Sequence, residues 1–327
     1  MKKKIRVALI YKSSYNFLSG NHFDNTTYHF FMHALKRNPN IEMTYYPSKN
    51  RFDVSKIQNK HDIILLPNNN TDGTPDELTG INNVSIPVIC RTGDPHYAKK
   101  YDQFKFDEKW KIDCYFNFMH EEYFYRFYPK KFKYKTILFG LEPSLYQNLI
   151  PFKERIKNKI LNSGATGKTE IVSRIANRIL NPRRSGWYFY KLRTKCNDLP
   201  YVVHPRKLGF EFQNDDYPRL LSRFQTAIAA TTFYPTIKYL ETTAAGCMTF
   251  MEITERNLGK YLGFSDDKTA IFINEDNYKE KFEEYLSDPD NPKWEEIASN
   301  GRKHVLDNLN NDVAANNLAE LMRNYLK

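Results

Sequence analysis

The sequence predicts an α/β protein built from two Rossmann-like halves, each a parallel sheet covered by helices. Strand-like and helix-like runs alternate along the 327 residues, which is the pattern of right-handed β-α-β crossovers. The strand-like runs are continuously apolar rather than alternating, as expected for strands buried on both faces. The alternation is interrupted once, over residues 140–151, where Gly and Pro punctuate the chain. We therefore predict an N-terminal domain of residues 1–148 and a C-terminal domain of residues 149–327.

The first half is expected to form six strands, at residues 5–11, 42–46, 62–67, 87–91, 112–118 and 136–139. Helices are expected at residues 26–37 and 54–59, and a further one beginning at 75–77, where Pro precedes two acidic residues. A polar loop, residues 13–25, follows the first strand.

The second half repeats the pattern. We expect strands at residues 158–161, 186–189, 226–230, 247–251 and 270–273, and helices at 170–180, 235–245, 278–286, 294–308 and 311–325. The last segment, 311–327, is expected to cross back and pack on the first domain.

The most informative segment is residues 226–251, which predict a strand, a helix and a second strand. The helix begins near Pro235 and stops at Gly246, the usual punctuation. Its first turn lies just beyond the end of a buried strand, where backbone N–H groups favour an anion. Lys238 adds a positive charge there, and Glu241 follows one turn later, suited to accept hydrogen bonds from vicinal hydroxyls. Together with Thr232 they are candidates to bind a nucleoside diphosphate.

The same segment resembles a known family. Residues 238–246 read K-Y-L-E-x-x-A-A-G, preceded by Y-P-R-L-L-S at 217–222 and followed by Gly301-Arg302. This sequence pattern resembles the C-terminal half of GT-B glycosyltransferases of the family-4-like group (glycosyl transferases group 1), and most closely the spore-maturation glycosyltransferases. The resemblance covers about residues 159–309.

The resemblance implies the GT-B fold, with two Rossmann-like domains facing across a cleft, and sugar transfer from a nucleotide donor, UDP or GDP, to an acceptor hydroxyl. It implies that Glu241 binds the ribose and that nearby cations bind the diphosphate. Family-4 enzymes usually carry another Glu eight residues upstream, at the position of Phe233. The sugar and the stereochemical outcome therefore stay open.

A second phosphate-binding candidate is the loop 163–169, which reads S-G-A-T-G-K-T. It fails the P-loop pattern, because Asn162 stands where that motif needs a small residue. A small-residue turn after a strand can still cradle phosphate through backbone N–H groups. Gly164, Lys168 and Arg174 are therefore predicted to contact the donor diphosphate, with a surface turn carrying a solvated lysine as the alternative.

Catalytic candidates lie in the loops of the first domain. Asp94 and His96 follow the expected strand 87–91, and either could act as a base toward the acceptor hydroxyl or orient the sugar. The alternative is that Asp94 only caps the next turn and His96 is a loop residue. Asp24 lies in the loop after the first strand, with a helix N-cap as its alternative role. Adjacent pairs of aspartates occur at 215–216 and 266–267, without a D-x-D motif, and no metal or other cofactor is expected.

The composition constrains the partners. The net charge of +11 favours a polyanionic partner, such as an anionic membrane surface, nucleic acid or acidic glycan, unless the charge is simply dispersed. Residues 121–134 mix aromatics with cations, typical of a membrane-facing patch, a stacking platform for bases, or a core helix beside a solvated loop. The lysines at 130, 131, 133 and 135 could form a surface that recruits an anionic acceptor or a bilayer.

Two further features bear on location. The four cysteines are scattered and two of them, Cys90 and Cys247, fall in apolar strands as expected for buried thiols. Without a signal-peptide core or an apolar run long enough to span a bilayer, a cytoplasmic location is expected, with peripheral membrane contact as an option.

Three other functions stay open at this point. One is a viral-type glucosyltransferase acting on DNA bases, and one is a non-catalytic protein that binds nucleic acid or anionic surfaces. The third, an NAD-dependent oxidoreductase, is weakened because no G-x-G-x-x-G follows the first strand.

Overall fold

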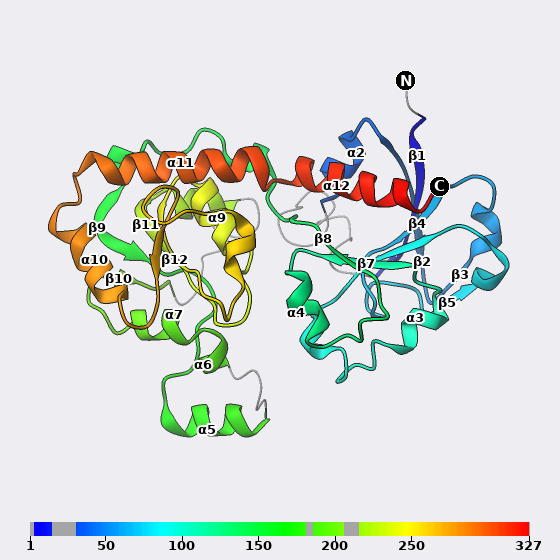
Figure 1. Cartoon of the computed structure of the whole chain (residues 1–327), viewed down its shortest axis with the longest axis horizontal. Coiled ribbons are helices and arrows are strands. Elements are labelled where there is room, and N and C mark those ends of the chain that lie inside the picture. The colour runs from blue at the N-terminus through cyan, green and yellow to red at the C-terminus, as the bar shows by residue number, and fades with distance from the viewer. Residues whose placement is uncertain (1–2, 15–30, 181–185, 206–215, 327) are drawn as a thin grey trace. The chain divides into compact units, whose positions relative to one another are not determined.

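The computed structural model describes residues 3–14, 31–180, 186–205 and 216–326. The chain forms two compact units (Figure 1). The first unit contains Met1–Glu142 together with Asn310–Lys327, and the second contains Pro143–Leu309.

The first unit is built on a six-stranded sheet in the order β2-β1-β4-β6-β7-β8, with every pairing parallel. Its strands are β1 (Ile5–Lys12), β2 (Ile41–Ser48), β4 (Ile63–Leu66), β6 (Val88–Arg91), β7 (Cys114–Asn117) and β8 (Tyr134–Thr136). A small parallel pair, β3 (Arg51–Asp53) and β5 (Glu77–Thr79), lies beside it. All six predicted strands of this half are therefore present, within a few residues of the expected bounds.

Both faces of this sheet are covered, which explains the uninterrupted apolar strands. Val7 and Leu9 of β1 enter one hydrophobic cluster, whereas Ala8 and Ile10 enter another on the opposite face. The helices are α2 (Met32–Arg37), α3 (Lys105–Lys109), α4 (Glu121–Tyr125) and α12 (Asn311–Asn324), and the 3-10 turns are η2 (Val54–Ile57), η3 (Ile81–Asn83) and η4 (Pro95–Tyr97).

The C-terminal helix α12 packs on the N-terminal unit, which confirms the predicted crossing. Ala315, Leu318 and Met322 are fully buried in the cluster that also holds Val7 and Leu9 of β1. Asn310 caps the helix start by accepting from the backbone N–H groups of Asp312 and Val313. Asn311 ties the first turn to Gly140, since its side-chain oxygen accepts a hydrogen bond from the Gly140 backbone N–H at 2.7 Å.

The second unit contains a five-stranded parallel sheet in the order β10-β9-β11-β12-β13. Its strands are β9 (Ile156–Leu161), β10 (Val202–Val203), β11 (Phe224–Ala229), β12 (Met248–Glu252) and β13 (Ile271–Ile273). The helices are α5 (Ile171–Leu180), α6 (Gly186–Phe189), α7 (Lys191–Cys196), α8 (Tyr217–Leu221), α9 (Lys238–Ala244), α10 (Tyr278–Ser287) and α11 (Pro292–Asn308), with 3-10 turns η5 (Pro143–Tyr146), η6 (Phe152–Glu154) and η9 (Gly259–Leu262).

Three sequence predictions of local structure were wrong. Residues 75–77 do not begin a helix, because the chain continues into β5, where buried Leu78 pairs with Phe52 of β3. Residues 186–189 form α6 rather than a strand, since Phe189 is buried against Tyr234 with ring centroids 5.2 Å apart. Helix α9 begins at Lys238, three residues later than the Pro235 start suggested. Aromatic content favours strands only weakly, and tertiary packing overrides it.

Candidate functional site

The topology of the second sheet indicates where a ligand binds. Strand β9 has β10 on one side and β11 on the other. The chain therefore adds strand β10 on one side of β9 and then the later strands on the other side, and the strand order reverses between β9 and β11. In open α/β sheets, ligands bind outside the carboxyl ends of the strands at such a switch point. The residues following β9 and β11 are therefore the first candidates for a binding site.

Gly164 makes the turn that follows β9 and is closely approached by Lys238. Its φ of +95° lies in the left-handed region, and a Cβ atom there would sit 2.2 Å from Cε of Lys238 and 3.4 Å from an amino nitrogen of Arg193. Glycine is thus required at this position by both its backbone conformation and its surroundings. The structure brings together Gly164 and Lys238, two residues 74 positions apart that the sequence had singled out separately.

The two cations around this glycine are held by neutral groups. The ammonium of Lys238 donates to the hydroxyl of Tyr217 at 2.6 Å, and that hydroxyl lies 2.5 Å from Oγ of Ser163. Arg193, only 1% exposed, donates from Nε to the side-chain oxygen of Asn162 at 2.9 Å and from a terminal nitrogen to the carbonyl of Ser163. Among the described residues, no salt bridge involves either cation.

Burial makes the charge of Arg193 costly. Loss of hydration lowers the pKa of its guanidinium, and the nearby tyrosines oppose this effect only in part. A buried cation without a carboxylate partner is normally stabilised by an anion. The cluster of Gly164, Arg193, Tyr217 and Lys238, called here the switch-point cluster, therefore has the charge and position of a phosphate site.

Glu241 lies one turn beyond Lys238 on α9 and is fully buried. The same helix is anchored by Tyr239, whose hydroxyl donates to the carbonyl of Glu252 at 3.0 Å and accepts from the backbone N–H of Thr231. Because the Glu241 carboxylate is closed off from solvent, direct contact with a ribose requires neighbouring residues to move.

The other predicted donor ligands lie in different surroundings. The hydroxyl of Thr232 donates to the carbonyl of Tyr188 at 2.6 Å, which ties the end of β11 to α6. Lys168 is exposed in the loop between β9 and α5. Arg174 lies on α5, with its guanidinium carbon 3.7 Å from the centroid of the Trp187 ring. Thr232, Lys168 and Arg174 stay predictions as donor ligands.

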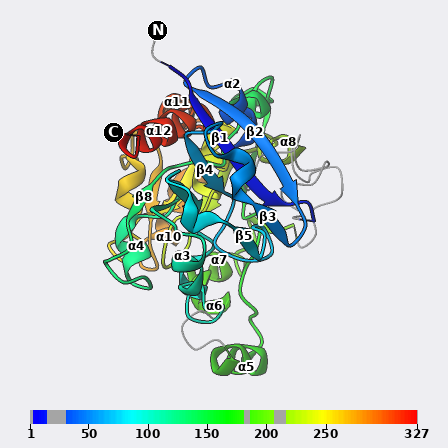
Figure 2. The same ribbon diagram turned by 90° about the vertical axis from the view of Figure 1, so that its right-hand side faces the viewer.

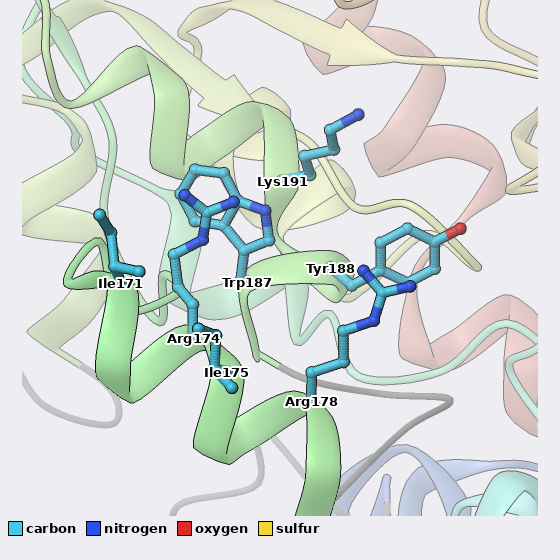
Figure 3. A pocket seen from close by; sticks show the side chains of 7 residues that line it. All are labelled: Ile171, Arg174, Ile175, Arg178, Trp187, Tyr188 and Lys191. Atoms are coloured by element: carbon cyan, nitrogen blue, oxygen red, sulfur yellow. The ribbon is translucent and has the colours of Figure 1, made fainter.

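Arg174 also lines a cavity of about 560 Å³ between α5 and α6 (Figure 3). Seven residues line it: Ile171, Arg174, Ile175, Arg178, Trp187, Tyr188 and Lys191. Three of these carry positive charge, and the arginines of α5 reach toward the two aromatic rings of α6.

The catalytic candidates Asp94 and His96 of the first unit lie side by side after β6. Asp94 stands at the N-terminal cap of η4, and its carboxylate oxygen lies 3.5 Å from Nε2 of His96. The other ring nitrogen of His96 lies 3.3 Å from the hydroxyl of Tyr123. The His96 side chain is 5% exposed and that of Asp94 is 42% exposed, so Asp94 is the member that an acceptor could reach. Asp24, the third catalytic candidate, lies outside the described residues.

Sequence reasoning missed three residues of interest in the second unit: Arg193, Tyr217 and Glu252. Tyr217 opens the Y-P-R-L-L-S segment that carried the family resemblance, so its position was noted without a role. Arg193 gave no such signal, because it lies in a cation-rich stretch that reads as solvated surface. Only the tertiary structure places it, buried, beside Gly164.

Glu252 ends β12 and is 7% exposed. Burial, followed by repulsion from Glu275, raises the pKa of its carboxyl to about 7, although Arg256 and Lys191 oppose the shift. Glu275 itself is held by Lys191 at 2.7 Å and Lys195 at 2.6 Å. A carboxyl poised near neutral pH at the carboxyl end of a strand is a candidate acid or base.

The aromatic segment beside the lysine cluster belongs to the core. Phe124 stacks on Tyr128 with ring centroids 4.3 Å apart and on Tyr134 at 4.1 Å, and all three rings are buried. They are therefore not available to stack on bases from outside. The lysines at 130, 131, 133 and 135 are exposed. Cys90 and Cys247 are buried free thiols, as predicted.

Two properties concern metals and membranes. Within the part of the chain that the structure describes, no three His, Cys, Asp or Glu side chains gather in a way that could hold a metal ion. The helices of the same part are all too short or too polar to cross a membrane.

Comparison with known proteins supports the assignment of the fold and the class. Residues 184–320 match the family described as Glycosyl transferase-like, a region that contains Arg193, Tyr217 and all of α9. A comparison with curated protein sequences finds no significant match.

Several solved structures share the fold over nearly the whole chain. A glycosyltransferase from Rickettsia africae aligns with a TM-score of 0.57 at 11% identity, covering 100% of both chains. An α-glucosyltransferase solved with UDP-glucose and DNA containing an abasic site aligns with a TM-score of 0.56 at 10% identity, covering 98% of this chain and 100% of that one. Anabaena Alr3699/HepE, solved with UDP-glucose, aligns with a TM-score of 0.55 at 10% identity over 98% and 100%.

These similarities confirm the GT-B fold, with its two parallel sheets and the C-terminal helix on the N-terminal unit. The fold and the family match over residues 184–320 together define the class: the chain is a glycosyltransferase.

Proposed function

We propose that this glycosyltransferase transfers a sugar from a nucleoside diphosphate donor, UDP or GDP, to an acceptor hydroxyl, and that the donor diphosphate binds the switch-point cluster. The observation that carries the proposal is the pair of cations Lys238 and Arg193 around Gly164, both held by neutral partners. A diphosphate supplies the negative charge that this cluster lacks.

The cluster also supports the chemistry of transfer. When the bond between the sugar and the diphosphate breaks, the leaving diphosphate gains negative charge. Fixed cations placed before the reaction stabilise that charge without reorganising, and this effect is usually the largest contribution to catalysis. Lys238, which is partly exposed, would contact the diphosphate, and buried Arg193 would stabilise it through its charge. Together they would supply the positive charge that a divalent metal supplies in other transferases, and we propose that turnover needs no metal.

The acceptor hydroxyl must lose its proton as the new glycosidic bond forms. We assign this role to Asp94, because its carboxylate is accessible and His96, hydrogen-bonded to Tyr123, lies behind it. The proton passes from the acceptor oxygen to the Asp94 carboxylate, and the electron pair of the cleaved bond leaves with the diphosphate.

The acceptor is proposed to be a glycan, a lipid-linked sugar or a surface polysaccharide. A DNA base is the second candidate, which the net charge of +11 favours because phosphate contacts dominate affinity for nucleic acid. The α-glucosyltransferase solved with DNA has the same fold.

Release of nucleoside diphosphate from a panel of UDP-, GDP-, ADP- and CMP-sugars tests the proposal. One donor should be hydrolysed slowly by water alone and faster with the correct acceptor present, and double-stranded DNA belongs among the acceptors tried. If no nucleotide sugar is consumed and none shifts the thermal unfolding midpoint, the proposed donor class is wrong.

A further inference from the structure

Helix α5 differs from the other helices of the second unit because none of its residues is buried. In both views of the molecule, α5 stands away from the sheet of its unit and is joined to it through α6 (Figures 1 and 2). The crossover between β9 and β10 is completed by α7, whose Leu192 and Cys196 pack in the core. Helix α5 is therefore an addition to the fold rather than part of its core.

The exposed surface of α5 is aliphatic. Five of its ten residues are large aliphatics that are 56% to 80% exposed: Ile171, Val172, Ile175, Ile179 and Leu180. Ile171, Ile175 and Ile179 recur at every fourth position, so they form one stripe along the helix. Elsewhere among the described residues, the exposed large hydrophobic side chains are scattered singly. An exposed apolar stripe of this kind marks a surface that is covered in function.

The polar side of the helix is cationic. Arg174 and Arg178 project from α5 toward α6, beside the aliphatic stripe, and line the cavity together with Lys191, Trp187, Tyr188 and the stripe residues Ile171 and Ile175 (Figure 3). A helix with aliphatic residues on one side, arginines beside them and aromatic residues near the boundary matches the pattern of helices that lie in the interface of a bilayer. The arginines reach phosphate headgroups while the isoleucines enter the acyl region.

We propose that α5 docks this glycosyltransferase on a bilayer containing anionic phospholipids, with Ile171, Ile175 and Ile179 inserted and Arg174 and Arg178 on the headgroup phosphates. A nucleic acid would also attract the arginines, but its phosphate backbone provides no apolar surface that could bury the aliphatic stripe. The charge and the apolar stripe together therefore favour a lipid surface. The inserted residues lie outside the switch-point cluster. Because Arg174 is also a predicted donor ligand, the test replaces Arg178 and leaves Arg174 in place.

The test is co-sedimentation of the full chain with vesicles of equimolar phosphatidylglycerol and phosphatidylcholine, beside vesicles of phosphatidylcholine alone. The triple variant Ile171→Gln/Ile175→Gln/Ile179→Gln should bind the anionic vesicles at least about 1,000-fold more weakly, since removing one inserted aliphatic side chain costs roughly tenfold or more. Arg178→Gln should lose about fivefold at low salt. Because α5 buries no residue, the thermal midpoint and the affinity for nucleoside diphosphate should not change.

Ile150→Gln/Ile156→Gln is the matched control, because both residues are exposed hydrophobics of the same unit outside α5; it should bind vesicles like the wild type. Three results would each overturn the proposal. The first is vesicle binding by the triple variant equal to that of the wild type. The second is a wild type that binds double-stranded DNA but not vesicles, and the third is a triple variant that differs from the wild type only in self-association.

Discussion

Replacing Gly164 with alanine displaces the Lys238 ammonium without changing any charge. The added Cβ would lie 2.2 Å from Cε of Lys238 and 3.0 Å from its nitrogen, so the side chain must move by about 1 Å to restore ordinary van der Waals contact. That movement also disturbs the 2.6 Å hydrogen bond to the hydroxyl of Tyr217.

The expected loss comes from one charge-assisted hydrogen bond to phosphate, which contributes about 1.5–3 kcal/mol. Gly164→Ala should therefore weaken nucleoside diphosphate binding roughly 10- to 150-fold by calorimetry. The φ of +95° adds a stability cost of about 1–2 kcal/mol, which is measured separately by urea unfolding.

Gly80→Ala is the matched control. Gly80 also has a positive φ, +78°, but a Cβ there would meet nothing within 4 Å, so this variant should lose stability and keep its nucleotide affinity. In a double-mutant cycle, Gly164→Ala should cost little affinity once Lys238 is replaced by Met, because the displaced ammonium is already gone. Full additivity of the two changes, or undiminished affinity in folded Gly164→Ala, would refute the reasoning.

Other expected outcomes concern two acids and the metal requirement. Glu252 has a pKa of about 7 in the folded protein against an ordinary 4.5, so the folded state binds the proton more tightly and the free energy of unfolding falls as pH rises between these values. Glu252→Gln should remove this pH dependence and raise the free energy of unfolding above pH 7 by at most about 3 kcal/mol over the wild type, measured by urea unfolding at pH 5 and 8. An equal change in the free energy of unfolding between pH 5 and 8 for both proteins would contradict it. Glu241→Ala should weaken nucleotide binding by about 1–3 kcal/mol in calorimetry, and an unchanged affinity in the folded variant would exclude a ribose contact. Sugar transfer should persist in excess EDTA, and a loss restored by magnesium or manganese would show that a metal takes part.

Much of the fold could be predicted because it depends on local patterns. The continuous apolar runs of β1 and β4 identified strands buried on both faces. Pro235 and Gly246 identified α9 and its end, although the helix begins three residues after Pro235. The prediction of secondary structure failed for short segments whose apolar residues show no helical or strand periodicity. Gly186 to Phe189 reads as a strand from its aromatics, but it forms helix α6, with Phe189 packed against Phe233 and Tyr234.

The candidate site was partly predictable for the same reason. Lys238 and Gly164 each stood in a recognisable local context, a helix start and a small-residue turn. Their proximity, and the burial of Arg193 beside them, result from strand order in the sheet. A single sequence carries no direct signal for that order, because pairing between distant strands depends on the packing of the whole unit.

The central claim is that a nucleoside diphosphate binds the switch-point cluster through Lys238. Calorimetric titration of UDP and GDP into the wild type, Lys238→Met and Lys260→Met tests it most directly, since Lys260 is an exposed lysine of the same unit that pairs with Glu255. The account predicts one-to-one binding of one of these nucleotides to the wild type and to Lys260→Met, and affinity lowered about 10- to 150-fold in Lys238→Met. Equal affinity of all three proteins, or no binding of either nucleotide to the wild type, would contradict it.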